Sequence, residues 1–163
     1  MGRSSEDREH SFIDQARIFL AAGRGGNGCC SFRREKYIPK GGPDGGCGGF
    51  GGNIILWATG DKNTLYHFQR NRHYRAEKGG HGSGKCKRGA AGEDLYLPVP
   101  LGTVVKDEEG NILCDLACEE QSFVAARGGR GGRGNSVFAS SRRQTPRFAE
   151  KGEPGEEKWI RLE

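Results

Sequence analysis

Short segments of strand-forming residues recur along the chain and alternate with long glycine-rich stretches. The segment 12–21, FIDQARIFLA, shows partial apolar alternation, and 53–58, NIILWA, is a continuous apolar run typical of a buried strand. The segment 64–70 fits either the end of a strand or a single helical turn. The other segments with strand character are 94–100, 102–106, 112–116, 122–127 and 158–162. Because no long amphipathic helix interrupts them, we expect an all-β sandwich or barrel.

Two features refine this pattern between residues 94 and 116. Pro98 and Pro100 lie in an alternating segment, and proline cannot donate to a sheet ladder, so we expect an edge strand or a bulge there. The residues 107–111, DEEGN, separate two apolar runs and predict the turn of a β-hairpin.

The glycine residues follow a period of three, which is neither the 3.6 of an α-helix nor the 2 of a strand. In 45–52, GGCGGFGG, glycine pairs recur at the pitch of the polyproline II helix, and similar spacing returns in 79–92 and 128–134. Polyproline II segments have no internal hydrogen bonds, so an ordered bundle must find partners on neighbouring segments. Flexible linkers are the alternative interpretation, but linkers are rarely interleaved with aromatic residues such as Phe32 and Phe50. Collagen is disfavoured because the triplets are few and the chain has only 6 prolines.

Composition predicts one domain with two lobes. The chain has 163 residues, of which 33% are hydrophobic and 29 are glycine, so the apolar core must lie outside the glycine tracts. We expect a disordered tail at 1–11 and a single domain at 12–163. The β lobe is expected from 12–22, 53–69, 94–127 and 157–163, and the glycine-rich lobe from 23–52, 70–93 and 128–156.

The formal net charge is +5, and the positive charge belongs to the glycine-rich segments. Cations greatly outnumber acids in 70–88 and 127–151, whereas acids dominate 106–120. A charge run is usually only a solvated face, but repeated basic clusters beside glycine segments favour a nucleic-acid partner. The cations of these clusters are Arg33, Arg34, Lys36, Lys40, Lys85, Lys87, Arg88, Arg142, Arg143 and Arg147. If the glycine segments form a bundle, the clusters converge at one end and contact phosphates.

Aromatic residues accompany these clusters. Phe32, Tyr37 and Phe148 either pack internally or stack on unpaired bases, and packing is the interpretation that we favour.

Motifs of enzymatic sites are incomplete in this sequence. Residues 23–28 satisfy the G-x-G-x-x-G spacing, but Pro39 and Pro43 break the helix that a dinucleotide site requires. Residues 79–86, GGHGSGKC, resemble a phosphate-binding loop, yet Cys86 replaces the magnesium-binding Ser or Thr and no buried strand precedes it. The cysteines and histidines show no zinc spacing, and no catalytic constellation is recognisable. We therefore expect no catalytic residue, no metal site and no cofactor in this chain.

Seven ordered blocks resemble a known family. They are Phe12-Ile13-Asp14, 22–29, 31–37, 40–46, 98–103, 126–132 and 152–156. Together they are similar to the N-terminal domain of the Obg family of ribosome-associated GTPases, over essentially the whole chain. The departures are Cys47, where the family pattern has Asp, and Ala90, where Lys is common, so the charge at those two points differs.

The resemblance implies a small eight-stranded jelly-roll-like β structure with a projecting lobe of six polyproline II helices. It also implies that GTP and Mg²⁺ belong to a separate GTPase domain, expected to follow the strand that ends at Glu163 and to lie outside this sequence. By position, the resemblance adds Arg130 and Arg133 to the candidate RNA-binding residues.

The same resemblance implies a role in late assembly of the large ribosomal subunit. Expected partners are that subunit, its rRNA near the peptidyl-transferase region, and the protein's own GTPase domain. We expect a monomer with no membrane partner, in the cytoplasm or in an organellar matrix or stroma. The alternative is a protein-interaction module that couples a GTPase to a stress-signalling partner, with the basic lobe merely solvated.

Overall fold

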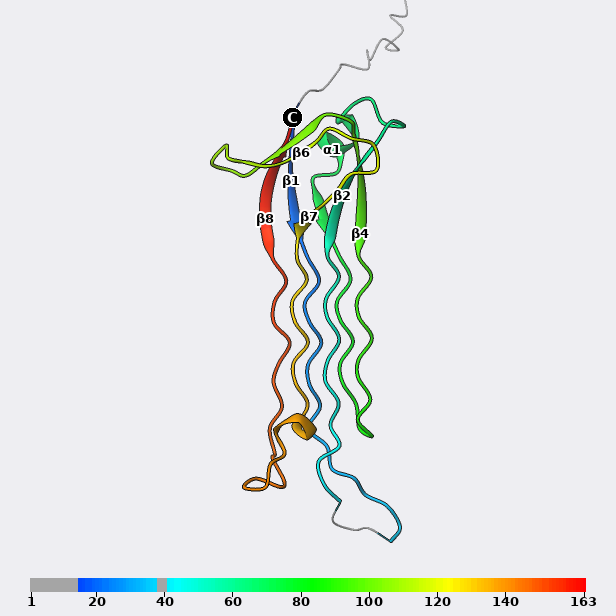
Figure 1. Ribbon diagram of the computed structural model, residues 1–163, viewed down its shortest axis with the longest axis vertical. Helices are drawn as coiled ribbons and strands as arrows, with labels where there is room; N and C mark the ends of the chain where they lie inside the picture. The colour runs from blue at the N-terminus through cyan, green and yellow to red at the C-terminus, as the bar shows by residue number, and fades with distance from the viewer. Residues whose placement is uncertain (1–14, 38–40) are drawn as a thin grey trace, which may run out of the picture.

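The computed structural model describes residues 15–37 and 41–163, which form an elongated molecule with a β structure at one end and a long glycine-rich projection (Figure 1). The expected tail, the block Phe12-Ile13-Asp14 and the candidate Lys40 lie outside the described residues. No helix in the described part has the length and hydropathy that crossing a membrane requires.

Two sheets make up the β structure. One sheet has the order β3-β1-β8-β5-β6, and the other has the order β4-β2-β7. The strands of the first sheet are β1 Ala16–Ala21, β3 His73–Arg75, β5 Thr103–Lys106, β6 Ile112–Leu116 and β8 Glu157–Leu162. The strands of the second sheet are β2 Ile54–Thr59, β4 Leu95–Pro100 and β7 Ser122–Ala126.

The hydrophobic core lies between the two sheets. Alternation along β1 turns Ile18 and Leu20 inward, where both are fully buried, because successive side chains of a strand point to opposite faces. They pack in one cluster with fully buried residues of the other strands, including Leu56 of β2. The short helix α1, Tyr66–Arg70, adds Phe68 to the same cluster. This core is the rigid base from which the glycine-rich segments project.

The all-β expectation is confirmed, with eight strands among the described residues. The hairpin is present as the antiparallel β5–β6 pair, and the proline-containing β4 lies at the edge of its sheet. The ambiguous segment 64–70 ends in a helical turn. Strand β3 was not expected, because His73–Arg75 is polar, and it forms only by parallel pairing with β1.

Six segments run side by side in the glycine-rich projection, which we call the shaft (Figure 1). They are 22–29, 45–53, 76–82, 88–94, 127–134 and 150–156. Backbone hydrogen bonds join neighbouring segments at every third residue: the Gly26 N–H donates to the Gly49 carbonyl at 2.9 Å, and the Gly49 N–H donates to Gly80 at 2.8 Å. The segments 22–29 and 45–53 lie at the centre, because each is bonded to four others. The alternative of flexible linkers is therefore wrong.

Close approach of the segments explains why glycine recurs along them. A Cβ atom added at Gly26 would lie 1.8 Å from the Gly80 carbonyl oxygen, and one at Gly48 would lie 1.9 Å from the Gly26 oxygen. No side chain fits at such distances, so the interior of the shaft is backbone alone and other side chains point outward.

Candidate nucleic-acid interface

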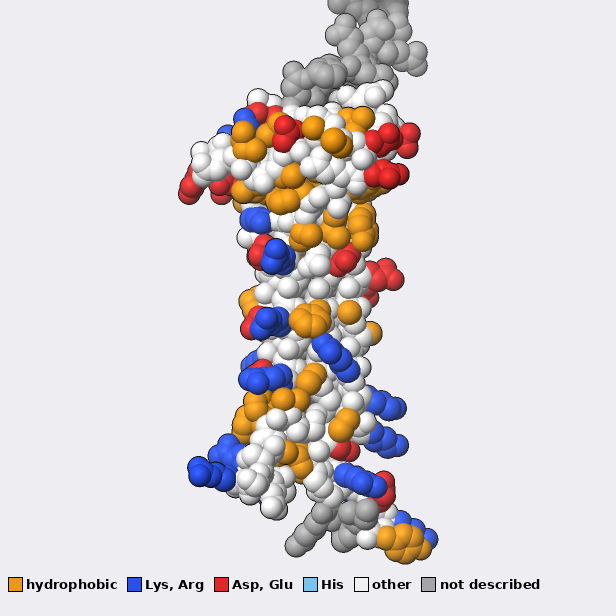
Figure 2. Space-filling view, in the orientation of Figure 1, with side chains coloured by type: hydrophobic (Ala, Val, Ile, Leu, Met, Phe, Trp, Pro, Cys, Tyr) orange, Lys and Arg blue, Asp and Glu red, His pale blue; other side chains and the backbone are white. Residues whose placement is uncertain are grey.

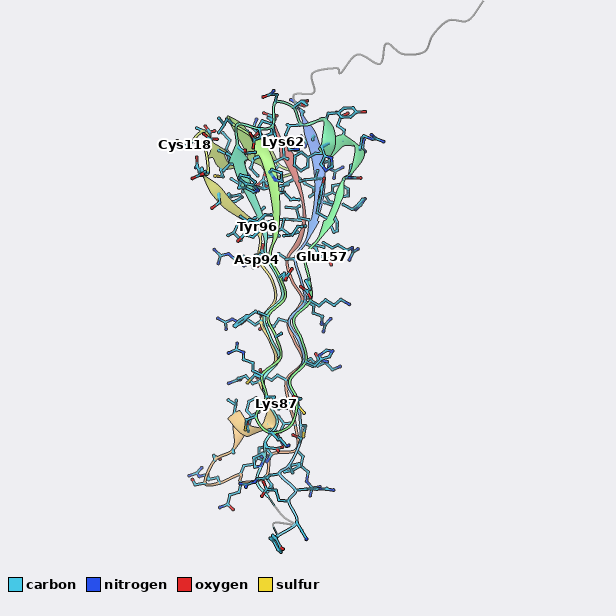
Figure 3. The ribbon with its side chains drawn as sticks, turned by 90° about the vertical axis from the view of Figure 1, so that its right-hand side faces the viewer. Lys62, Lys87, Asp94, Tyr96, Cys118 and Glu157 are labelled. Atoms are coloured by element: carbon cyan, nitrogen blue, oxygen red, sulfur yellow. The ribbon has the colours of Figure 1, made fainter. Side chains whose placement is uncertain are left out.

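Three connections close the shaft at the end far from the sheets, and we call this end the tip (Figures 1 and 3). Its described residues are 30–37, 41–44, 83–87 and 135–149. Each connection joins a segment that leaves the sheets to one that returns, so the tip gathers residues that are far apart in the sequence.

Asp44 ties two of the three connections together. Its side chain accepts from the Ser31 hydroxyl at 2.6 Å and from the Lys85 N–H at 3.1 Å, and its carbonyl accepts from the Cys86 N–H at 2.7 Å. These contacts hold Lys85 and Cys86 in left-handed conformations, with φ of 60° and 55°. The Ser31 and Lys85 hydrogen bonds lower the pKa of Asp44 below 3.8, because they stabilise the charged carboxylate.

Asn135 fastens the third connection. This fully buried residue begins the 3₁₀ helix η1, Asn135–Phe138, directly after the last glycine of the shaft segment 127–134. Its Oδ1 accepts from the Gly45 N–H at 2.8 Å, and its Nδ2 donates to the carbonyls of Ser31 at 2.9 Å and Pro146 at 3.1 Å. A buried amide with both ends satisfied fixes the geometry of its partners. Asn135 therefore positions the loop 139–149 against the first connection.

Aromatic residues at the tip remain partly open. Phe138 and Phe148 pack with ring centroids 4.7 Å apart, while Phe148 stays 43% exposed and Arg143 lies 5.5 Å from its ring centroid. Tyr37 is 86% exposed, so the expectation that it packs internally is wrong. Arginine over an aromatic face and an exposed ring both offer flat surfaces on which a base stacks.

The basic clusters lie together at the tip, where Figure 2 shows Lys and Arg side chains on both sides of its end. Arg33 pairs with Glu35 at 3.0 Å. Among the described residues, the other candidates at the tip or next to it are exposed and have no carboxylate within 4.0 Å. These are Arg34, Lys36, Lys85, Lys87, Arg88, Arg142, Arg143 and Arg147. Of these, Arg88 lies at the tip end of the shaft, over the exposed Phe50 ring.

Arg130 and Arg133 lie on the shaft, with Arg133 at its tip end, where its guanidinium is 4.8 Å from the ring centroid of Phe138. They line a groove of about 670 Å³ together with acidic side chains of the facing segment. Arg133 forms an ion pair with Glu150 at 2.6 Å, and this contact lowers the pKa of Glu150. These two arginines thus differ from the tip cations, because carboxylates already face them.

Asp44, Ser31 and Asn135 are the organising residues that sequence reasoning missed. A weak signal existed, since Asp44 lies between Pro43 and Gly45 and Asn135 directly follows a glycine tract. Neither position reveals its partners, which are distant in sequence.

The sheet end carries the opposite charge. The acidic turn between β5 and β6 and other acids give red patches at that end in Figure 2. Within the described residues, no three His, Cys, Asp or Glu side chains come close enough together to hold a metal ion. The most distinctive chemistry of the described surface is therefore a basic, aromatic-bearing tip on a backbone shaft.

Comparison with known proteins agrees with this architecture. A family model described as GTP1/OBG matches residues 13–163. A protein named GTPase Obg from Syntrophomonas wolfei is 58% identical over 153 residues, which are 93% of this chain and 36% of that protein. The GTPase Obg of Sulfurihydrogenibium sp. is 59% identical over 93% of this chain and 44% of its own length. The chain thus spans less than half the length of these relatives.

Proposed function

Because the chain belongs to the GTP1/OBG family, we propose that it is the RNA-binding domain of an Obg-type GTPase and docks its tip on the RNA of the large ribosomal subunit. In this proposal it acts in late assembly of that subunit, near the peptidyl-transferase region. GTP and Mg²⁺ are held by another part of the whole protein, and the cytoplasm or an organellar matrix is its place of action. The domain works as a monomer.

The observation that carries the proposal is the set of unpaired cations at the tip. Arg34 and Lys36 project from the first connection and Lys87 from the second, and no carboxylate among the described residues neutralises them. Cations of this kind bind phosphates, while the exposed ring of Tyr37 provides a surface for an unpaired base. Charge and stacking together are typical of proteins that bind irregular RNA.

The shaft supports the same function mechanically. Its segments are cross-linked by backbone hydrogen bonds along its length, so the tip is held at a distance from the sheets rather than on a flexible tether. A narrow arm of this kind suits a deep RNA-lined site that the broader β structure cannot enter (Figure 1).

A second candidate function is a protein-docking module, and one observation favours it. The outer face of the β4-β2-β7 sheet carries apolar side chains in register, with Ile55 between Tyr96 and Val124. Tyr96 is 59% exposed and Val124 is 40% exposed. An exposed apolar face of this kind is typical of a protein contact.

The two candidates differ in their dependence on salt. Binding of the chain to purified large subunits is measured across a potassium chloride series for wild type and for Arg33→Ala/Arg34→Ala/Lys36→Ala. Loss of up to three phosphate contacts lowers the slope of log affinity against log salt by roughly 2. The expected result is weaker binding of the variant with that flatter slope.

The matched control removes three exposed cations from the sheet end, as Lys62→Ala/Arg70→Ala/Arg72→Ala. It should bind like wild type. Equal binding by the tip variant and wild type, or an affinity that does not respond to salt, would instead favour protein docking through the apolar face.

A further inference from the structure

One side of the shaft bears two adjoining hollows. The charged side chains that line them are mostly basic, whereas the groove at Arg130 is lined by both basic and acidic side chains. The hollow nearer the sheets measures about 240 Å³ and the one nearer the tip about 290 Å³. Both are lined by Arg24 and Lys78, so they lie next to each other, and we call the two together the furrow. Its floor is the segment 22–29, and its walls are the segments 76–82 and 150–156.

The walls are held to the floor rather than to each other. The Gly79 N–H of one wall donates to the Arg24 carbonyl at 2.8 Å. From the opposite wall, the Gly152 N–H donates to the Asn27 side chain at 2.9 Å, and the Gly25 N–H of the floor donates to Glu153 at 2.9 Å. The furrow is therefore part of the hydrogen-bonded lattice and is present before any ligand arrives.

Cations line the furrow because of the three-residue period. Lys78 and His81 lie three residues apart on one wall, so they share a face and follow one another at about 9 Å, given a rise of about 3.1 Å per residue. Arg75, at the end of β3, lines the hollow nearer the sheets. Lys151 stands on the other wall and Arg24 on the floor. All five side chains belong to exposed residues, and within the described chain none of them has a carboxylate within 4.0 Å.

The acidic residues of both walls point elsewhere. Glu77 accepts from the Glu93 N–H at 3.0 Å, on the side of the segment 88–94. Glu150 pairs with Arg133, Glu153 lines the groove with Arg130, and Glu156 pairs with Lys158 at 3.3 Å. Among the described residues, Glu157, at the sheet end, is the one acid that lines either hollow. No acid of the described part of the chain lines the hollow nearer the tip.

Of the other polar groups of the furrow, the His81 ring offers a donor, whereas the backbone N–H groups of the floor do not. His81 Nδ1 accepts from the Asn27 N–H at 2.9 Å, so the neutral ring carries its proton on the other nitrogen, Nε2. The N–H groups of Gly23, Gly25 and Gly26 on the floor are already bonded within the shaft. A ligand is thus recognised by charged side chains and needs to bring acceptors.

We propose that the furrow of Arg24, Arg75, Lys78, His81 and Lys151 binds the phosphodiester backbone of RNA. It extends the contact from the tip along the shaft, and in that respect it rests on the proposed function. Its occupant is a phosphate chain because the site offers repeated basic side chains, and no Phe, Tyr or Trp among its described lining residues provides a ring on which a base stacks.

The test uses Arg24→Gln/Lys78→Gln/Lys151→Gln, in which each Gln removes a charge but keeps a donor. Its affinity for large subunits is measured over the salt series, beside Lys62→Gln/Arg70→Gln/Arg72→Gln as a control with the same charge change. The furrow variant should lower the log–log salt slope by roughly 2, as three lost phosphate contacts would. A slope equal to that of the control would overturn the proposal.

A second readout does not require a variant. In wild type, the reactivity of lysines toward an acetylating reagent is followed by mass spectrometry with and without large subunits. Lys78 and Lys151 should become protected while Lys62 does not. Unchanged reactivity of Lys78 and Lys151 would refute the furrow as a contact.

The outcomes distinguish the proposal for the furrow from the proposal for the tip. If Arg33→Ala/Arg34→Ala/Lys36→Ala weakens binding but the furrow variant does not, the furrow alone is refuted; if neither variant matters, both proposals fail. Inorganic tripolyphosphate is the probe for a small free anion. Protection of Lys78 and Lys151 by tripolyphosphate but not by subunits would assign the furrow to that anion and refute RNA.

Discussion

At the scale of single residues, two polar side chains organise a tip that has almost no apolar core of its own. Asn135 is buried and bonds to the Gly45 N–H of the shaft and to carbonyls of the first and third connections, and Asp44 joins the first connection to the turn at 83–87. Hydrogen bonds to such groups replace the hydrophobic packing that positions loops in most domains. The exposed cations owe their placement to these two residues.

The pH dependence of Asp44 follows from its contacts. Its pKa is lowered in the folded protein, so the stabilisation is present above the unfolded value of about 3.9 and is lost as the pH falls through the folded-state value. We expect the ¹H–¹⁵N signal of the Lys85 amide to be constant from neutral pH down to the ordinary carboxyl range and to move only as the pH falls through the lowered pKa of Asp44.

The control for that titration is Asp44→Asn, which retains an acceptor oxygen but cannot ionise. Its Lys85 signal should stay fixed over the same acidic range. A Lys85 signal that titrates equally in wild type and in Asp44→Asn would show that another group controls the turn.

At the scale of elements, the parts of the fold that depend on local sequence signals could be predicted, and the parts that depend on pairing between distant segments could not. The β5–β6 hairpin and the edge position of β4 follow from turn residues and prolines, which act within a few residues. Strand β3 could not be predicted, because it exists only through contacts such as the 2.6 Å hydrogen bond from the Phe19 N–H to the Arg72 carbonyl. The shaft segments could be predicted from their glycine period of three, because that signal also lies within a few neighbouring residues.

The shaft makes a sharp prediction for substitution at two glycines. Gly26→Ala places a Cβ 1.8 Å from a backbone oxygen, whereas a Cβ at Gly42 meets nothing within 4 Å. We expect Gly26→Ala to lower the free energy of unfolding by about 3 kcal/mol, at the upper end of typical overpacking costs. Gly42→Ala should stay within about 0.5 kcal/mol of wild type. Urea denaturation measures both, and equal stabilities would contradict a close-packed shaft.

At the scale of the whole molecule, charge and shape are polarised along one axis. Basic loops occupy the tip and acidic residues gather at the sheets (Figures 1 and 2). Convergence of the basic clusters could be predicted once the glycine segments were expected to form a bundle. The neighbours of each segment could not, because the glycine triplets are nearly alike in sequence. The position of Arg133 opposite Glu150 is therefore a finding of the structure.

The chain carries an exposed cysteine near each end of this axis, to which a chemical probe can be attached. Cys86 is exposed in the tip turn at 83–87, and Cys118 is exposed between β6 and β7, where Figure 3 shows it at the sheet end. Serine replaces Cys30 and one of these two, which leaves a single exposed cysteine. An iron chelate on that cysteine cleaves any RNA backbone nearby by releasing hydroxyl radicals.

The most direct test of the account is to bind these two chelate-bearing proteins to large ribosomal subunits and map the cuts in the rRNA. The half-buried cysteines are common to both proteins and provide a shared background. The account predicts strong, localised cuts from Cys86 and few from Cys118. Cuts from Cys118 with none from Cys86 would place the sheets, rather than the tip, on the RNA and would contradict it.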